Sequence, residues 1–290
     1  MIGIVFNGGG SRIAAHAGYT IGPLANVKYD QLFGVSAGSI WASVLGFRGP
    51  QVGLQVLAEI TSTDQIFVKK DDIALIGDLA LRRYPGVPYG YGPLRKLIQK
   101  YIVGRPSVPV TISRVHINTG YHQHITANPD GTFETDNDAL GKVETIEDFQ
   151  DAIVCSCIIY PMVDGFIAKN GIDGYADGGY REAGPVKIAM ENGCTELHIC
   201  LTGMFSQDSG ANGQDGSIIG GTTNLFLAMA NENLLNDVDE VIENQNVTSF
   251  FYMGTYQGDS NVFDQVDIQA NIKTASQVQP VLRNNLKIID

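Results

Sequence analysis

Short apolar runs rich in β-branched residues recur along the chain, and several of them end at glycine. The run Ile2–Phe6 precedes Asn-Gly-Gly-Gly, and residues 29–33 precede Gly34. Continuous apolar runs that stop at turn residues are typical of buried parallel strands. Comparable runs predict further strands over residues 108–119, 197–201 and 249–253.

Segments with helical spacing separate these runs. Residues 36–46 are small and apolar, and residues 94–102 follow Gly92-Pro93, a common helix start. Similar spacing predicts helices over residues 52–60, 73–82, 146–157, 185–192 and 224 to about 242. Strands that alternate with helices predict an α/β protein of three layers, α/β/α, with a mostly parallel central sheet.

Two segments predict antiparallel additions to this sheet. Residues 125–133 contain Asn-Pro-Asp-Gly, and residues 167–176 cross Asn170-Gly171, both of which favour hairpin turns. No shift in composition and no internal repeat divides the chain. We therefore expect a single domain over residues 1–290.

Composition and charge limit the function classes. The 290 residues are 44% hydrophobic, and 19 Lys and Arg oppose 31 Asp and Glu, a net charge of −12. This charge repels nucleic acid and anionic lipid at long range, so we expect no nucleic-acid partner. The opening residues do not resemble a signal peptide, and we expect a soluble, cytoplasmic protein. The four cysteines do not form a disulfide framework and are interpreted as reduced core residues.

Charge is unevenly distributed. Residues 69–105 carry eight basic and three acidic side chains together with tyrosines, which indicates a flap that contacts membrane surfaces transiently. Acidic residues over 232–243 indicate a solvated helix face. No cluster of His, Cys and Asp has metal-ligand spacing, so we expect hydrolytic chemistry with no metal and no cofactor.

The segment Gly34-Val35-Ser36-Ala37-Gly38 fits the nucleophile-elbow pattern G-x-S-x-G between a predicted strand and a predicted helix. The two glycines remove Cβ atoms that would collide with the strand and the helix, and the turn projects the Ser36 oxygen outward. The N–H of Ala37, at the helix start, would face a developing oxyanion.

A glycine-rich loop follows the first predicted strand. Gly8, Gly9 and Gly10 allow successive N–H groups to converge on one anion, and Arg12 stands beside them. The loop lacks the spacing of a P-loop, and Ile13 occupies the place of a glycine in the dinucleotide-binding pattern. Two anion-binding loops after adjacent strands predict an oxyanion site.

A serine nucleophile requires a base. Asp177, followed by two glycines at a predicted strand end, can accept the proton directly if its surroundings are dry. The order Ser36, Asp177, His198 also allows a Ser–His–Asp esterase, although His198 lies inside an apolar stretch. His122 and His124 flank Gln123 in a predicted hairpin and are interpreted as surface or pairing residues.

Together these three motifs resemble those of the patatin-like phospholipase family in order and spacing. The residues over 152–161 and 184–193 are also similar to family helices, and the resemblance covers about residues 1–205. It implies a patatin-like fold and a Ser–Asp dyad that hydrolyses lipid acyl esters through an acyl-enzyme. Ser36 would be the nucleophile and Asp177 the base.

The resemblance further implies that Gly9, Gly10 and Gly8 supply oxyanion N–H groups, and that Arg12 supports the loop or meets substrate charge. The sequence departs from the family at Asn7, where Asp is usual, and at Ile13, where Gly is usual. These departures leave open a catalytically silent member that binds a lipid or a protein partner.

Overall fold

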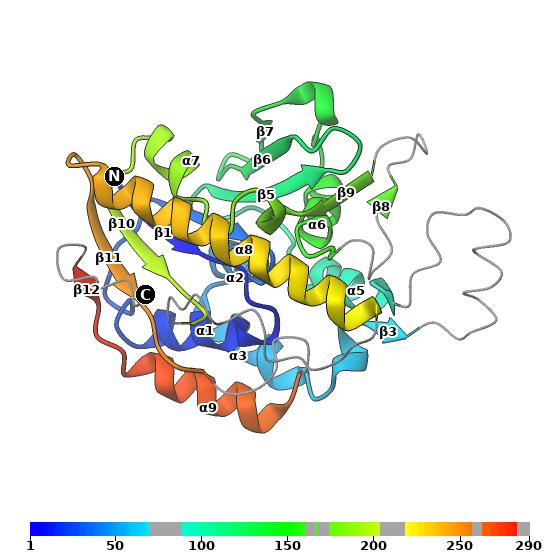
Figure 1. The fold of residues 1–290 in the computed structure, drawn as a ribbon, viewed down its shortest axis with the longest axis horizontal. Coiled ribbons are helices and arrows are strands. Elements are labelled where there is room, and N and C mark those ends of the chain that lie inside the picture. Colours follow the sequence, from blue (N-terminus) through cyan, green and yellow to red (C-terminus); the bar gives the residue numbers. More distant parts are fainter. Residues whose placement is uncertain (70–88, 160–165, 168–173, 204–217, 257–262, 283–290) are drawn as a thin grey trace, which may run out of the picture.

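The computed structural model describes residues 1–69, 89–159, 166–167, 174–203, 218–256 and 263–282. Within these residues, one sheet of ten strands has the order β12-β11-β10-β1-β2-β5-β6-β7, and β9 pairs with β5 and β8 (Figure 1). The five central strands are parallel: β11 (Thr248–Tyr252), β10 (Glu196–Cys200), β1 (Ile2–Phe6), β2 (Gln31–Val35) and β5 (Val110–His116).

The remaining strands of the sheet run antiparallel to their neighbours: β6 (His122–Ala127), β7 (Phe133–Thr135), β8 (Phe166–Ile167), β9 (Gly174–Asp177) and β12 (Val281–Leu282). A separate two-stranded ladder joins β3 (Val68–Lys69) to β4 (Tyr89–Gly90). The sheet is therefore mostly parallel at its centre and antiparallel toward its edges.

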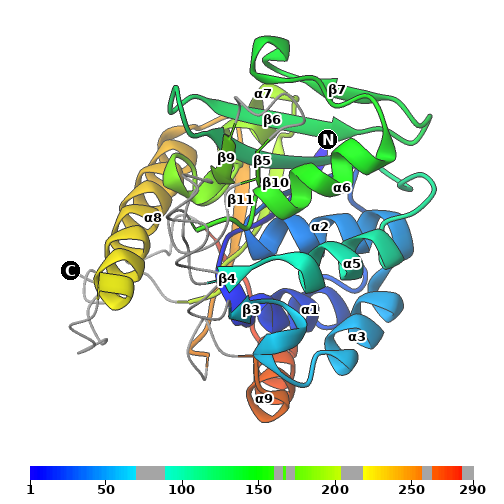
Figure 2. The ribbon, with the colours of Figure 1, turned by 90° about the vertical axis from the view of Figure 1, so that its right-hand side faces the viewer.

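Helices cover both faces of the sheet, which gives the predicted three layers (Figure 2). In β1, Ile4 and Phe6 pack into one core cluster while Val5 packs into the other, as strand alternation requires. One layer contains α1 (Ile13–Ile21), α2 (Ala37–Arg48), α3 (Pro50–Glu59), α5 (Gly92–Tyr101), α6 (Ile146–Cys155) and α9 (Gln265–Ser276). The opposite layer contains α7 (Val186–Glu191) and α8 (Ile218–Glu243).

The expected strands, hairpins and helices are confirmed within a few residues, except where they fall outside the described residues and except that α8 begins at Ile218, before the predicted start at residue 224. The predicted helix over 73–82 lies outside them, as do residues 70–88 of the predicted flap. In the described part of the chain, no helix is long and apolar enough to cross a bilayer.

Two of the α-helices that the structure describes were not predicted, and they pack against each other. Residues 13–20 of α1 are all buried, so α1 presents no polar face that would reveal its period. In α9, Ile268, Asn271 and Ala275 are buried and the rest is more exposed. Gly18 of α1 lies directly against the α9 backbone, where a Cβ would collide with the Ile272 carbonyl.

Strand β5 brings two distant chain segments to one place. Its residue Ser113 pairs with Val35, the last residue of β2, and its next residue, Arg114, pairs with Asp177, the last residue of β9. β2 runs parallel to β5 and β9 runs antiparallel to it, so the two strands approach each other end to end. Both strands must end at this junction, so the backbone leaves the sheet at Ser36 after β2 and at Gly178 after β9.

Candidate active site

Ser36 occupies the turn between β2 and α2 in a strained conformation. Its φ of 54° and ψ of −131° make it the one non-glycine residue with positive φ in the described part of the chain. Its N–H donates to Ser156 Oγ at 2.9 Å, and its carbonyl accepts from Ser39 N at 2.9 Å and Ser39 Oγ at 2.6 Å. These three bonds hold a conformation that the backbone alone disfavours.

The two glycines of the G-x-S-x-G pattern are required by close backbone packing. A Cβ on Gly34 would collide with the carbonyl of Gly38, and a Cβ on Gly38 would collide with the carbonyl of Phe6. The first contact lets β2 turn sharply into α2, and the second lets α2 begin against the end of β1. The turn therefore leaves the Ser36 side chain half-buried at the edge of a cavity.

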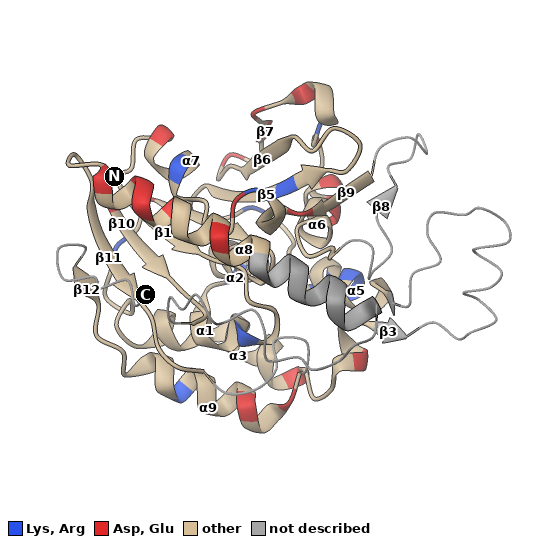
Figure 3. Ribbon diagram, viewed as in Figure 1, with Lys and Arg blue, Asp and Glu red and all other residues tan. Residues whose placement is uncertain are grey.

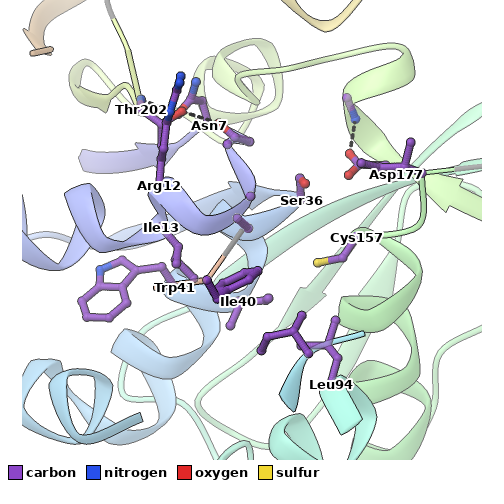
Figure 4. Close-up of a pocket in the computed structure, with 18 of the residues that line it drawn as sticks. Asn7, Arg12, Ile13, Ser36, Ile40, Trp41, Leu94, Cys157, Asp177 and Thr202 are labelled. Atoms are coloured by element: carbon purple, nitrogen blue, oxygen red, sulfur yellow. Dashed lines mark hydrogen bonds between the residues drawn. The ribbon is translucent and has the colours of Figure 1, made fainter. Parts of the chain in front are cut away.

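Asp177 is completely buried and points toward Ser36 (Figure 4). Its Oδ1 accepts the Gly179 N–H at 2.8 Å, whereas its buried Oδ2 has no hydrogen-bond partner among the described residues. Burial raises the pKa of Asp177 to about 7, because the nearby Ser36 hydroxyl and the Gly179 N–H offset only part of the desolvation. The Ser36 hydroxyl is therefore close enough to lower the pKa of Asp177, although the two side chains form no hydrogen bond in this conformation; catalytic hydrogen bonds are often long before substrate binds.

Gly178 fits the junction between the two strands. A Cβ at this position would lie 2.5 Å from Ser113 Oγ and 2.8 Å from the Val35 side chain. Glycine after Asp177 is therefore the residue that lets β9 end against β2. This contact explains the first glycine of the Asp-Gly-Gly motif in steric terms.

Hydrogen bonds with Thr202 fix the glycine-rich loop. Asn7 Oδ1 accepts the Thr202 N–H at 3.0 Å, and Thr202 Oγ1 donates to the Gly8 carbonyl at 2.7 Å. A Cβ on Gly9 would collide with the Thr202 side chain. The amide of Asn7 thus supplies the acceptor that holds this loop, without the negative charge of an aspartate.

The N–H groups of the loop differ in their availability. The Gly8 N–H donates to the Ala183 carbonyl at 3.3 Å. Among the described residues, the N–H groups of Gly9, Gly10 and Ala37 have no hydrogen-bond partner. In this conformation Gly8 is thus engaged within the protein, while the other three remain able to bind an anion.

Ile13 and Arg12 complete the loop. Ile13 has φ −46° and ψ −28°, an ordinary helical conformation, so its position does not require glycine. Arg12 precedes α1 and lines the cavity beside Asn7 and Thr202 (Figure 4). The loop therefore accommodates both departures from the family pattern without strain.

Ser36, Asp177 and the glycine loop open into one cavity of about 240 Å³. Apolar side chains from α1, α2, α3, α5 and the segments beside them form most of its wall: Ile13, Ile40, Trp41, Val44, Val56, Leu57, Ile60, Ile66, Phe67, Leu94, Leu97 and Phe263. A polar end with an apolar interior is suited to a ligand that joins a carbonyl group to a hydrocarbon chain.

No histidine lines this cavity, although all five histidines belong to the described residues. His198 lies on β10, with Nδ1 bonded to the Tyr252 hydroxyl at 2.7 Å and Nε2 to Glu196 at 2.9 Å. Strand β1 separates β10 from β2, so His198 does not meet Ser36. The geometry does not assemble the alternative Ser–His–Asp site.

Several residues that support the site were missed by sequence reasoning. Ser156 and Thr202 lie far from Ser36 in sequence and carry no motif. Asn233 donates to the Gly179 carbonyl at 3.0 Å, and Asp237 Oδ2 accepts the N–H groups of Ala183 and Gly184 at 3.0 and 2.9 Å. Asp237 belongs to the acidic stretch that was predicted to be solvated, and Figure 3 shows acidic residues along the C-terminal half of α8.

Comparison with known proteins agrees with this geometry. No curated protein matched the chain. The family model described as patatin-like phospholipase matches residues 4–190, which is more than half of the chain and includes the elbow, the glycine loop and the Asp-Gly-Gly motif. The chain therefore belongs to the patatin-like phospholipase family, a family of lipid acyl hydrolases.

Proposed function

We propose that the protein hydrolyses acyl ester bonds of lipids, with Ser36 as nucleophile and Asp177 as general base. The observation that carries this proposal is the pairing of a strained serine with a buried carboxylate oxygen that has no described partner, at the mouth of an apolar cavity. Family membership supports the same reaction class.

In the proposed mechanism, ionised Asp177 takes the Ser36 proton while Oγ attacks the ester carbonyl. With a pKa of about 7, Asp177 is a stronger base than an exposed aspartate and is still ionised to a useful degree at neutral pH. The same carboxyl then returns the proton to the leaving alcohol, which leaves an acyl-enzyme on Ser36. Water hydrolyses this ester with Asp177 again as base.

The N–H groups of Gly9, Gly10 and Ala37 are proposed to stabilise the oxyanion of both tetrahedral intermediates. Ala37 is the first residue of α2, so the positive end of the helix dipole also faces the developing charge. Gly8 shapes the loop, and its N–H could bind the oxyanion only after its hydrogen bond to the Ala183 carbonyl breaks. Arg12 lies where it can meet negative charge on the substrate headgroup.

The apolar wall favours an acyl chain as the group held inside the protein. The acyl chain would extend from the carbonyl at Ser36 between α2, α3 and α5, while the alcohol leaves toward solvent.

The alternative function, a catalytically silent binding module, rests on the two departures from the family pattern, Asn7 and Ile13. Both residues fit the loop, and this favours the hydrolase.

Transient contact with a membrane surface remains part of the proposal. It rests on the positive charge of residues 69–105, of which α5 is the helical portion described by the structure. All three basic side chains Arg95, Lys96 and Lys100 are exposed. Arg95 pairs with Asp151 at 2.7 Å and Lys100 with Glu59 at 2.8 Å, whereas Lys96 has no ion-pair partner among the described residues. Unchanged sedimentation with anionic liposomes after charge reversal of Arg82, Arg83 and Lys96 would refute this contact.

Active-site labelling tests the proposed hydrolase directly. A fluorophosphonate probe is expected to label the parent protein and to fail with Ser36→Ala. Ser43→Ala is a matched control, because Ser43 lies on α2, is buried, and has an Oγ without a partner among the described residues. A parent protein that neither labels nor hydrolyses a p-nitrophenyl acyl ester would establish the binding module instead.

A further inference from the structure

A second group of chemically active side chains lies outside the cavity. His122 and His124 occupy alternate positions of β6, so strand geometry places both imidazoles on one face of the sheet. Their rings lie 4.3 Å apart between centroids. Glu182, from the segment after β9, is 7% exposed in its side chain and approaches both rings.

Three potential ligand atoms converge in this cluster. Glu182 Oε2 lies 2.9 Å from His124 Nε2 and 3.5 Å from His122 Nε2, and all the ligand atoms lie within 4.8 Å of one another. A tetrahedral zinc ion with bonds of about 2.1 Å separates its ligands by about 3.4 Å. The two separations from Glu182 are close to that value, and the imidazole nitrogens lie within 4.8 Å of each other, so side-chain rotations could bring all three atoms onto one metal ion.

One atom of the cluster is not satisfied by any residue that the structure describes. His122 Nε2 is buried and has no hydrogen-bond partner among the described residues. Sharing a proton between His124 and Glu182 satisfies those two side chains but not His122. A metal ion would use all three atoms, including this lone pair.

The surroundings also favour a metal ligand set. His124 Nδ1 lies 2.7 Å from Asp136 Oδ2, and a carboxylate at one ring nitrogen directs the lone pair of the other toward a metal. Glu191 and Glu240 interact electrostatically with Glu182 and add negative potential to the cluster. The histidine side chains are 20% and 14% exposed, which leaves an entry path and a position for water.

We propose that His122, His124 and Glu182 bind a divalent transition metal, and that Zn²⁺ fits this set of two imidazoles and one carboxylate best. None of the three residues lines the cavity, so the metal is assigned no step of ester hydrolysis. It would fasten β6 to the segment that leads from Asp177 to Ala183. Because the Ala183 carbonyl accepts the Gly8 N–H, the site would stabilise the glycine loop indirectly.

Metal titration of the full chain tests the proposal without reference to activity. After removal of metal with a chelator, isothermal titration with ZnCl₂ is expected to show one equivalent bound. His122→Gln and His124→Gln are each expected to weaken this affinity by about 100-fold, and Asp136→Asn by about 10-fold. Co²⁺ in place of Zn²⁺ should give the visible absorption of a site with four or five ligands, lost in His122→Gln.

His198→Gln is the matched control, because His198 pairs with one carboxylate and has no second imidazole beside it. This variant should bind Zn²⁺ as the parent does. Should His124→Gln fail to fold, His122→Gln decides, since this substitution breaks no hydrogen bond between His122 Nε2 and a described residue. The absence of a stoichiometric site in the parent, or equal affinity in the His122 variant, would overturn the proposal whether or not the protein is a hydrolase.

Discussion

Val35 and Asp177 pair with successive residues of β5, so the last residue of β2 and the last residue of β9 meet end to end. The serine that follows Val35 and the carboxyl of Asp177 are thereby placed by backbone pairing rather than by flexible loops. Residues set on rigid strands keep a more precise geometry than residues set on loops. This arrangement accounts for a proposed nucleophile and a proposed base that are far apart in sequence yet close in space.

Replacing Asp177 with Asn should stabilise the fold while it abolishes turnover. The pKa of Asp177 is raised by burial from 3.8 to about 7, so the folded state holds a proton that the unfolded state releases between these pH values. Stability from this group is complete below the unfolded pKa and is lost as pH rises through 7. The gain in the free energy of unfolding on Asp177→Asn should grow from near zero below pH 4 to at most about 4 kcal/mol at pH 8.

Urea denaturation at pH 4, 6 and 8 measures this gain. The matched variant is Asp239→Asn, an exposed position on α8, whose effect should stay within about 0.5 kcal/mol. A loss of stability in Asp177→Asn at pH 8 would mean that the ionised carboxylate is favoured in the folded state.

The pH dependence of hydrolysis should report the same group. If Asp177 is the general base, as proposed, it must be ionised to accept the proton, so kcat/KM for an uncharged ester should fall tenfold per pH unit below an apparent pKa near 7. Asp237→Asn is the control, since burial also raises the pKa of Asp237, to about 8. If kcat/KM instead began to fall only near pH 4, or if the apparent pKa shifted in the Asp237 variant, the titrating group would be one other than Asp177.

Gly38→Ala should unfold or strongly destabilise the protein. The added Cβ would collide with the backbone carbonyl of Phe6, which cannot move without breaking the start of α2 away from β1. We expect a loss of about 3 kcal/mol or more in the free energy of unfolding. Gly92→Ala, also in the first turn of a helix but with open space around it, should instead be neutral or stabilise by up to about 1 kcal/mol. Thermal unfolding of the two variants gives the comparison.

Ser156→Ala should impair catalysis more than binding. Its Oγ accepts the Ser36 N–H at 2.9 Å and helps to hold the strained turn. Loss of this bond should cost about 1–2 kcal/mol and lower kcat about tenfold, with little change in KM. Ser43→Ala, which removes a buried hydroxyl without a described partner, should leave both constants unchanged. Equal kinetic effects in the two variants would show that the Ser156 contact is not required.

The central fold could be predicted from sequence because its signals are local. The strand Ile2–Phe6 is apolar without interruption, and Gly34 and Gly38 stand where two backbones touch. Each of these features can be recognised from a few consecutive residues of the sequence. The elbow, the glycine loop and the Asp-Gly-Gly motif could be recognised for the same reason.

What the sequence did not reveal depends on long-range packing. Ser156 and Thr202 are brought to the site only by the folding of the chain, and the residues next to them in sequence do not indicate these contacts. His122 and His124 do carry a local signal, since alternate strand positions share a face, but their carboxylate partner is 58 residues from His124. Helix α1 gave no periodic pattern because its residues are buried on every side.

The packing of α9 on α1 has a consequence for how the protein forms during synthesis. Helix α1 directly follows the glycine loop near the start of the chain, whereas its cover, residues 265–276, emerges from the ribosome late. The family model ends at residue 190, so the segment that buries α1 lies beyond the matched region. Because contacts between distant parts of a chain form only after both parts exist, the face of α1 that packs against α9 stays uncovered until residues 265–276 have been synthesised and have left the ribosome.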